Sequence, residues 1–98
     1  MTVFLPSSTY PILAIAVRSE LDVIASRQRA RQIAAICGFC SQDQARIGTA
    51  VSDLARDVYD VTTAGQVRFS LSNWGANQAL TIVVEDIGDD LVDLHQLM

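Results

Sequence analysis

The segment from Ser41 to Asp60, SQDQARIGTAVSDLARDVYD, carries the first candidates for chemistry in this chain. Asp53 and Asp57 are four residues apart, so on a helix they project from the same side, one turn from each other. A carboxylate oxygen is a suitable ligand for magnesium, and a positioned carboxylate can act as a general base. Considered alone, an aspartate pair at this spacing is most often a solvated helix surface.

Cys37 and Cys40 are separated by two residues, a spacing found in redox sites and in half of a zinc site. In a thioredoxin-like site the first cysteine opens a helix, whereas Cys37 closes one predicted helix and Cys40 precedes the next. The single His95 is far away in sequence, and we expect it on a solvated face. We therefore expect buried, reduced cysteines, with a redox or metal role as the alternative.

A long amphipathic helix over Ser41–Asp60 must position the two carboxylates. Ser41 and Gln44 have the spacing of a capping box, and Asp43 adds favourable negative charge at the first turn. Apolar residues recur at three- and four-residue spacings, which predicts one buried stripe. The stripe comprises Ile47, Ala50, Val51, Leu54, Ala55, Val58 and Val61, and Arg56 falls on the polar side.

A strand and a second helix precede this element. The apolar run Ile12–Val17 predicts a covered strand, and Ser19 is suited to cap a helix over Glu20–Cys37. Gly38 is suited to the left-handed residue after that helix. The side chains expected to face inward are Val23, Ile24, Ala30, Ile33, Ala34 and Cys37.

A hairpin follows the long helix. Gln66–Ser72 alternates apolar and polar residues, which predicts a half-buried strand, and Leu80–Glu85 is expected to pair with it antiparallel. The connection Asn73–Asn77 is longer than the tightest hairpin turns and holds Trp74. After Asp86 to Asp90, leucines spaced three apart predict a short final helix.

The order strand, helix, helix, strand, strand, helix predicts an α+β two-layer sandwich, with a mixed sheet of three to four strands packed on two long helices. The 98 residues fit a single domain, with residues 1–10 as an N-terminal arm or edge strand and 11–98 as the core. Because helices cover only one side of such a sheet, we expect a homodimer or a hetero-complex.

The charge balance limits the classes of partner. A net charge of −4 and the absence of lysine argue against a general nucleic-acid binder, which needs a basic face. Arg27, Arg29 and Arg31 are close in sequence but are spread around the predicted helix. The N-terminal residues lack a basic signal region, and no apolar run has the length of a membrane span. We expect a cytoplasmic protein without membrane contact.

The succession ELDVIASRQRARQIAAICGF, then DQARIGTAVSDLARDVY, then a hairpin ending TIVVEDIGDD resembles the anti-sigma-factor and switch-protein serine kinase branch of the Bergerat-fold, or histidine-kinase-like, ATPases. The resemblance extends from Pro11 to Val92, and the DQARI-to-DLARD segment is its most specific part. It implies a shortened histidine-kinase-like ATPase fold, in which we expect the family's lid, second glycine-rich motif and last strands to be lacking.

The resemblance also implies site residues. In that family the long helix carries a glutamate at the reaction centre and, four residues on, an asparagine that holds magnesium on the nucleotide phosphates. The matching positions are Asp53, one methylene shorter, and Asp57, which adds negative charge beside the phosphates. The family's adenine-binding turn, aspartate-any-glycine-any-glycine, corresponds to Asp86 and Gly88, with Asp90 in place of the second glycine.

Two main classes of function follow from the resemblance. The first is a regulatory protein-interaction module with weak or lost nucleotide binding, whose partner is a STAS-domain antagonist or a sigma factor. The second is an active serine protein kinase or ATPase using Mg-ATP, with magnesium at Asp57 and a lid from another chain or from a segment outside this sequence. We favour the first, because phosphoryl transfer depends on positioning and charge neutralisation. Trp74 and Arg56 are the candidate partner contacts, and a Cys37/Cys40 redox sensor is a weaker alternative.

Overall fold

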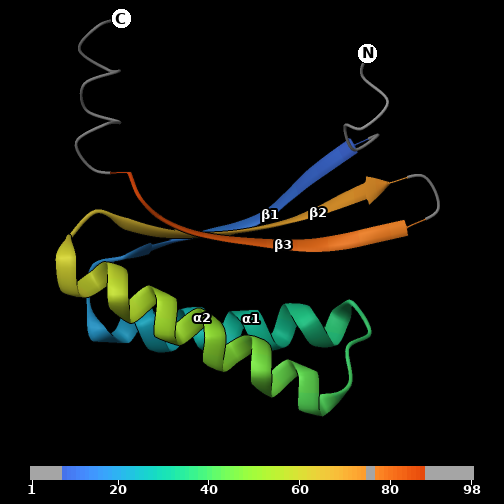
Figure 1. The fold of residues 1–98 in the computed structure, drawn as a ribbon, viewed down its shortest axis with the longest axis horizontal. Coiled ribbons are helices and arrows are strands. Elements are labelled where there is room, and N and C mark those ends of the chain that lie inside the picture. The colour runs from blue at the N-terminus through green and yellow to red at the C-terminus, as the bar shows by residue number, and fades with distance from the viewer. Residues whose placement is uncertain (1–7, 75–76, 88–98) are drawn as a thin grey trace, which may run out of the picture.

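Two helices cover one face of a three-stranded sheet in the computed structural model, which describes residues 8–74 and 77–87 (Figure 1). The elements in chain order are β1 (Ser8–Val17), α1 (Glu20–Ile36), α2 (Ser41–Val61), β2 (Gly65–Trp74) and β3 (Asn77–Asp86). This order and the two layers confirm the predicted α+β class. The final helix expected after Asp90 lies outside the described residues.

The sheet has the order β1-β2-β3, and its three described strands are antiparallel throughout, where a mixed sheet was expected. β2 is therefore the central strand. Its alternating apolar and polar residues fit an antiparallel strand with one face toward the helices and the other toward solvent. β1 begins earlier than predicted, and its pairing with β2 shifts register between Pro11 and Leu13. A proline is tolerated there because β1 is an edge strand and the register shift falls beside it.

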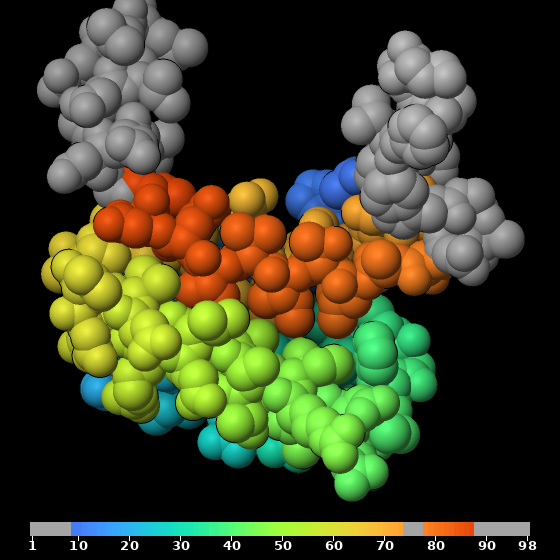
Figure 2. Space-filling view, viewed as in Figure 1, coloured from blue at the N-terminus to red at the C-terminus, as the bar shows by residue number. Residues whose placement is uncertain are grey.

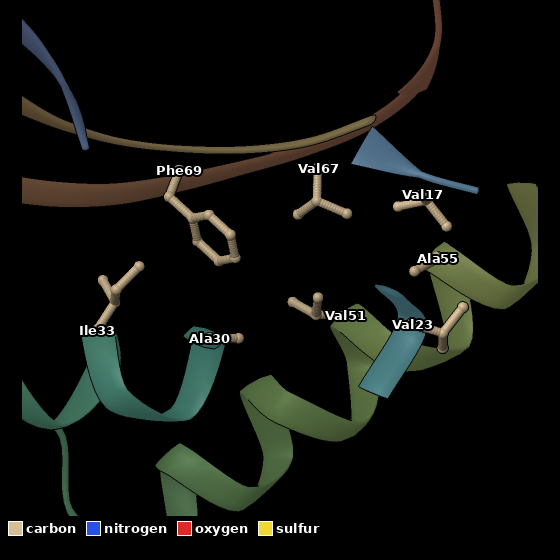
Figure 3. Close-up of a cluster of buried hydrophobic side chains, with 8 residues drawn as sticks. All are labelled: Val17, Val23, Ala30, Ile33, Val51, Ala55, Val67 and Phe69. Atoms are coloured by element: carbon tan, nitrogen blue, oxygen red, sulfur yellow. The ribbon is translucent and has the colours of Figure 1, made fainter. Parts of the chain in front are cut away.

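The core lies between the sheet and the helices, and Figure 3 shows its side chains pointing toward one another from both layers. Val67 and Phe69 from β2 are fully buried, which confirms the inward face predicted from the alternation. The complete cluster consists of Val17, Val23, Ala30, Ile33, Val51, Ala55, Val67 and Phe69. All of these except Ala30 and Ala55 are β-branched or aromatic, so each buries a large apolar area and stabilises the fold.

Both ends of α1 follow the predicted local signals. The Ser19 hydroxyl accepts a hydrogen bond from the Asp22 amide at 3.3 Å, and Gly38 adopts a φ of 92° after the last turn. The amides of Gly38 and Phe39 donate to carbonyls of the preceding turn, at 3.1 and 3.0 Å. This pair of bonds is the Schellman ending that a left-handed glycine permits. The α1–α2 connection is thereby held in a single tight turn.

The start of α2 differs from the predicted capping box. Cys40 is the N-cap residue and makes no side-chain capping bond, whereas Ser41 is already helical. Gln44 donates its side-chain amide to the Phe39 carbonyl at 2.8 Å, so it ties the helix to the preceding turn. The tight ending of α1 explains the difference, because only four residues, 37–40, separate the two helices, and Cys40 is the last of them.

The hairpin turn is also shorter than predicted. Trp74 at the end of β2 pairs with Asn77 at the start of β3, so two residues connect the strands where a longer turn was expected. Both strands extend beyond their predicted ends, because backbone pairing continues past the apolar residues that define the sequence pattern. None of the described helices is long and apolar enough to cross a membrane.

Candidate functional site

The two carboxylates of α2 lie on the surface of the molecule. Asp53 and Asp57 are both exposed, one turn apart, on the side of α2 opposite its buried residues Gly48, Val51 and Ala55. Neither forms a hydrogen bond or an ion pair among the described residues. The helical placement predicted from the sequence is therefore what the structure shows, and both carboxylates are accessible to a ligand.

An open hollow of about 400 Å³ lies along this side of α2. Its lining residues are Ala45, Arg46, Thr49, Ala50 and Asp53. Asp57 does not line the hollow, so the two carboxylates are not gathered around one enclosed cavity. Arg46, which lines the hollow, also forms an exposed ion pair with Asp43 at 3.8 Å.

Asp86, the last residue of β3, lies beside the C-terminal end of α2, and Asp57 is in the last turns of that helix. Asp57 is one turn from the end of the helix, and Figure 1 shows this end of α2 close to the end of β3. The Thr62 hydroxyl donates to Asp86 Oδ1 at 3.3 Å and accepts from the Ala64 amide at 3.1 Å. The Ile87 amide donates to the Ala64 carbonyl at 3.0 Å. These bonds fix the predicted adenine-binding carboxylate against the turn after α2.

The contact through Thr62 could not be deduced from the sequence, because it depends on where β3 ends relative to β2. Gly65 pairs with Asp86 in the sheet, which brings the turn beside the carboxylate. Gly88 and Asp90, the other members of the expected adenine-binding turn, lie outside the described residues.

Apolar side chains on α2 are more exposed than predicted. Leu54 is 53% exposed and Val61 is 84% exposed, although both belong to the predicted buried stripe. They are two turns apart on the helix, with Asp57 between them in sequence, and α2 runs beside β3 on this face (Figure 2). The three described strands are too few to cover the full apolar width of α2, which leaves an apolar surface beside an acidic group.

Arg56, a predicted interaction residue, is exposed but forms an ion pair within the chain. Its Nη1 donates to Glu20 Oε1 at 2.7 Å, joining α2 to the start of α1. The hydrogen bond to Glu20 and the charge of Glu20 raise the pKa of Arg56 above its ordinary value. Trp74, the second predicted interaction residue, is the last residue of β2, and its side chain lies outside the described part of the structure.

The cysteines are not buried, contrary to expectation. Cys37 caps the end of α1 and Cys40 caps the start of α2, and both are exposed free thiols. The whole connection between the helices is exposed, from residue 35 to residue 42. No group of three or more histidine, cysteine, aspartate or glutamate side chains within residues 8–74 and 77–87 could hold a metal ion.

Magnesium at Asp57 would accordingly need most of its ligands from elsewhere. Mg²⁺ commonly binds one or two carboxylates and completes its shell with water and substrate phosphates. An exposed Asp57 is compatible with that mode, in which the ion arrives together with a nucleotide.

A long helix bearing Asp53 and Asp57 one turn apart, beside a hairpin that ends in an aspartate, resembles the arrangement of the anti-sigma-factor and switch-protein serine kinase branch, in which the second helix position is an asparagine. Comparison with known proteins supports this class. The chain is 36% identical over 84 residues to the serine/threonine-protein kinase RsbT of Bacillus subtilis (strain 168). The aligned residues make up 86% of the chain and 63% of RsbT. The chain is therefore similar to a kinase of this branch, and it spans about 63% of the length of RsbT.

No protein-family model matches the chain, and no solved structure matches it either.

Proposed function

We propose that this chain is a regulatory protein-interaction module related to the bacterial switch-protein serine kinases, with weak or lost nucleotide binding. The observation that carries the proposal is the charge on the exposed side of α2. Asp57 stands where the family has a neutral asparagine, and Asp53 is a second unpaired carboxylate one turn away. Nucleotide phosphates placed there would meet two negative groups unless a metal ion neutralised them.

The arginines of α2 compensate for this charge only in part. The hydrogen bond to Glu20 is the main cause of the raised pKa of Arg56, and the charge of Asp53 also contributes to it. Arg46 is engaged with Asp43 and Arg56 with Glu20, so both guanidinium groups already have carboxylate partners. Phosphoryl transfer relies on cations placed around the developing charge. The described part of the chain supplies more acid than base at this surface, which favours binding of a protein over phosphoryl transfer.

The sheet supports the expectation of a partner. Its face opposite the helices carries exposed Ala14, Ala16 and Thr81, half-buried Val83, and the ion pair of Arg68 with Glu85 at 2.7 Å. An open face that carries both apolar and polar side chains is suited to contact with a second protein surface. Either a homodimer or a hetero-complex with a STAS-domain antagonist or sigma factor is consistent with such a face.

We expect the chain to bind a STAS-domain protein encoded by the same genome without any nucleotide present. Calorimetric titration measures the affinity, and light scattering of the mixture distinguishes a hetero-complex from a homodimer of the chain alone. Binding that appears only after Mg-ATP is added would favour the alternative, an active ATP-dependent serine protein kinase. A chain that stays monomeric and binds no such protein under either condition would overturn the proposal.

A further inference from the structure

Gly48 stands in the middle of α2, where glycine is unfavourable. A glycine inside a helix costs about 0.5–1 kcal/mol relative to alanine. The residue is buried, and a Cβ placed on it would lie 2.7 Å from Arg31 Cγ, 3.0 Å from Arg31 Cδ and 3.4 Å from Arg27 Cγ. The space left by the missing side chain is therefore filled by the stems of two arginines from α1.

Arg27 and Arg31 have no ion pair or hydrogen bond from their side chains to any described residue. They are one turn apart on α1, a spacing at which like charges repel. Arg29 between them donates to Gln32 at 3.2 Å, and it lies on a different side of the helix. Two guanidinium groups thus stand together, exposed and uncompensated, in a chain whose net charge is −4.

Apolar side chains flank the two arginines. Leu21 and Ile24 are 75% and 49% exposed, and they precede Arg27 and Arg31 at the three- and four-residue spacings of one helix side. The residues that α1 buries, Val23, Ser26, Ala30, Ile33 and Ala34, form the neighbouring side of the helix. We call Leu21, Ile24, Arg27 and Arg31 the α1 strip. Ile24 was expected to face inward, and its exposure is part of what distinguishes this strip.

These features oppose folding stability and have one explanation in common. An interior glycine, a like-charge pair and exposed apolar residues each break a local rule, and such departures concentrate at functional surfaces. The guanidinium fork is suited to paired contacts with carboxylates, and it is weakly hydrated enough to bind them at an interface. A nucleic acid is a poor candidate for the ligand of this surface. Two arginines on an acidic protein neutralise too few phosphates to release many of the counterions around a nucleic acid.

We propose that the α1 strip, seated on Gly48, is a docking surface for an acidic segment of a protein partner. Carboxylates of that segment pair with Arg27 and Arg31, and its apolar side chains contact Leu21 and Ile24. Gly48 positions the arginines by receiving their stems. The inference rests on the proposed interaction function and adds to it the surface and the chemistry of the partner.

The test is calorimetric titration of the STAS-domain protein into the wild type and three variants. Arg31→Glu is expected to weaken binding about tenfold or more, because it places like charge against the partner's carboxylates. Arg29→Glu makes the same change of net charge on the other side of α1, and we expect its affinity to stay within about twofold of the wild type. Gly48→Ala should weaken binding without any change of charge, because the added methyl group displaces the stem of Arg31.

Thermal unfolding of each variant shows whether it is folded, and Arg27→Glu replaces Arg31→Glu if that variant is unfolded. Equal losses in Arg29→Glu and Arg31→Glu would mean that net charge alone steers binding, which would overturn the docking surface. Unchanged affinity in Arg31→Glu would overturn it as well, while leaving the proposed function intact. Failure of the wild type to bind would overturn both.

Discussion

Replacing Phe69 by alanine is expected to lower the free energy of unfolding by about 3–5 kcal/mol. Phe69 lies on the central strand and is 1% exposed, and Figure 3 shows its ring directed from the sheet toward the helices. Truncation removes the largest fully buried side chain among the described residues and leaves a cavity in the close-packed core. Urea denaturation followed by circular dichroism measures the change.

Ser70→Ala is the matched control for Phe69→Ala. Ser70 is the next residue of β2 and faces the opposite side of the sheet, so we expect a change within about 0.5 kcal/mol. Phe69→Leu retains much of the apolar volume and remains measurable if the alanine variant does not fold. A loss below about 1 kcal/mol for Phe69→Ala would mean that the core is not where the structure places it.

Gly65→Ala is expected to destabilise the chain by about 1–3 kcal/mol. A Cβ on Gly65 would lie 2.5 Å from Val58 Cγ1, and the valine is stiff because it branches at Cβ. Gly65 begins β2 directly after the turn that holds Asp86, so the close approach of α2 to the sheet depends on this glycine. Chemical denaturation of the single variant gives the loss.

The cause of that loss is tested by a double-mutant cycle with Val58→Ala. Removing Cγ1 of Val58 makes room for the new methyl group, so the double variant should be more stable than the sum of the two single losses predicts, by about 0.5–2 kcal/mol. Additive losses would show that the contact between Val58 and Gly65 does not limit the substitution.

The element order and the buried face of β2 could be predicted because each is encoded locally. Alternation along β2 fixes which side chains face the helices, and Ser19 and Gly38 mark the two ends of α1 by capping chemistry. The start of α2 could not be predicted in the same way. The tight ending of α1 leaves Cys40 as the N-cap, although the local pattern favoured Ser41.

Exposure on the helices was the least predictable property. Periodicity shows which side of a helix is apolar, but the width that becomes buried depends on how many strands lie against it. Ile24, Leu54 and Val61 fit the apolar patterns and are nevertheless exposed, because three described strands cover only part of the helix layer.

For the candidate site, helical spacing was sufficient to place Asp53 and Asp57 together, but not to find their surroundings. The Thr62 contact with Asp86 depends on strand register, and the arginine stems over Gly48 depend on how α1 and α2 pack. The one available signal for the second feature was a glycine within an otherwise strong helical pattern.

The most direct test of the central claim is calorimetric titration with ATP, with and without magnesium, on the same preparation that binds the STAS-domain protein. We expect no saturable heat in either condition up to about 1 mM ATP, the upper end of common enzyme KM values. Saturable, magnesium-dependent binding that disappears in Asp57→Ala would contradict the proposed function and identify the chain as a nucleotide-binding kinase.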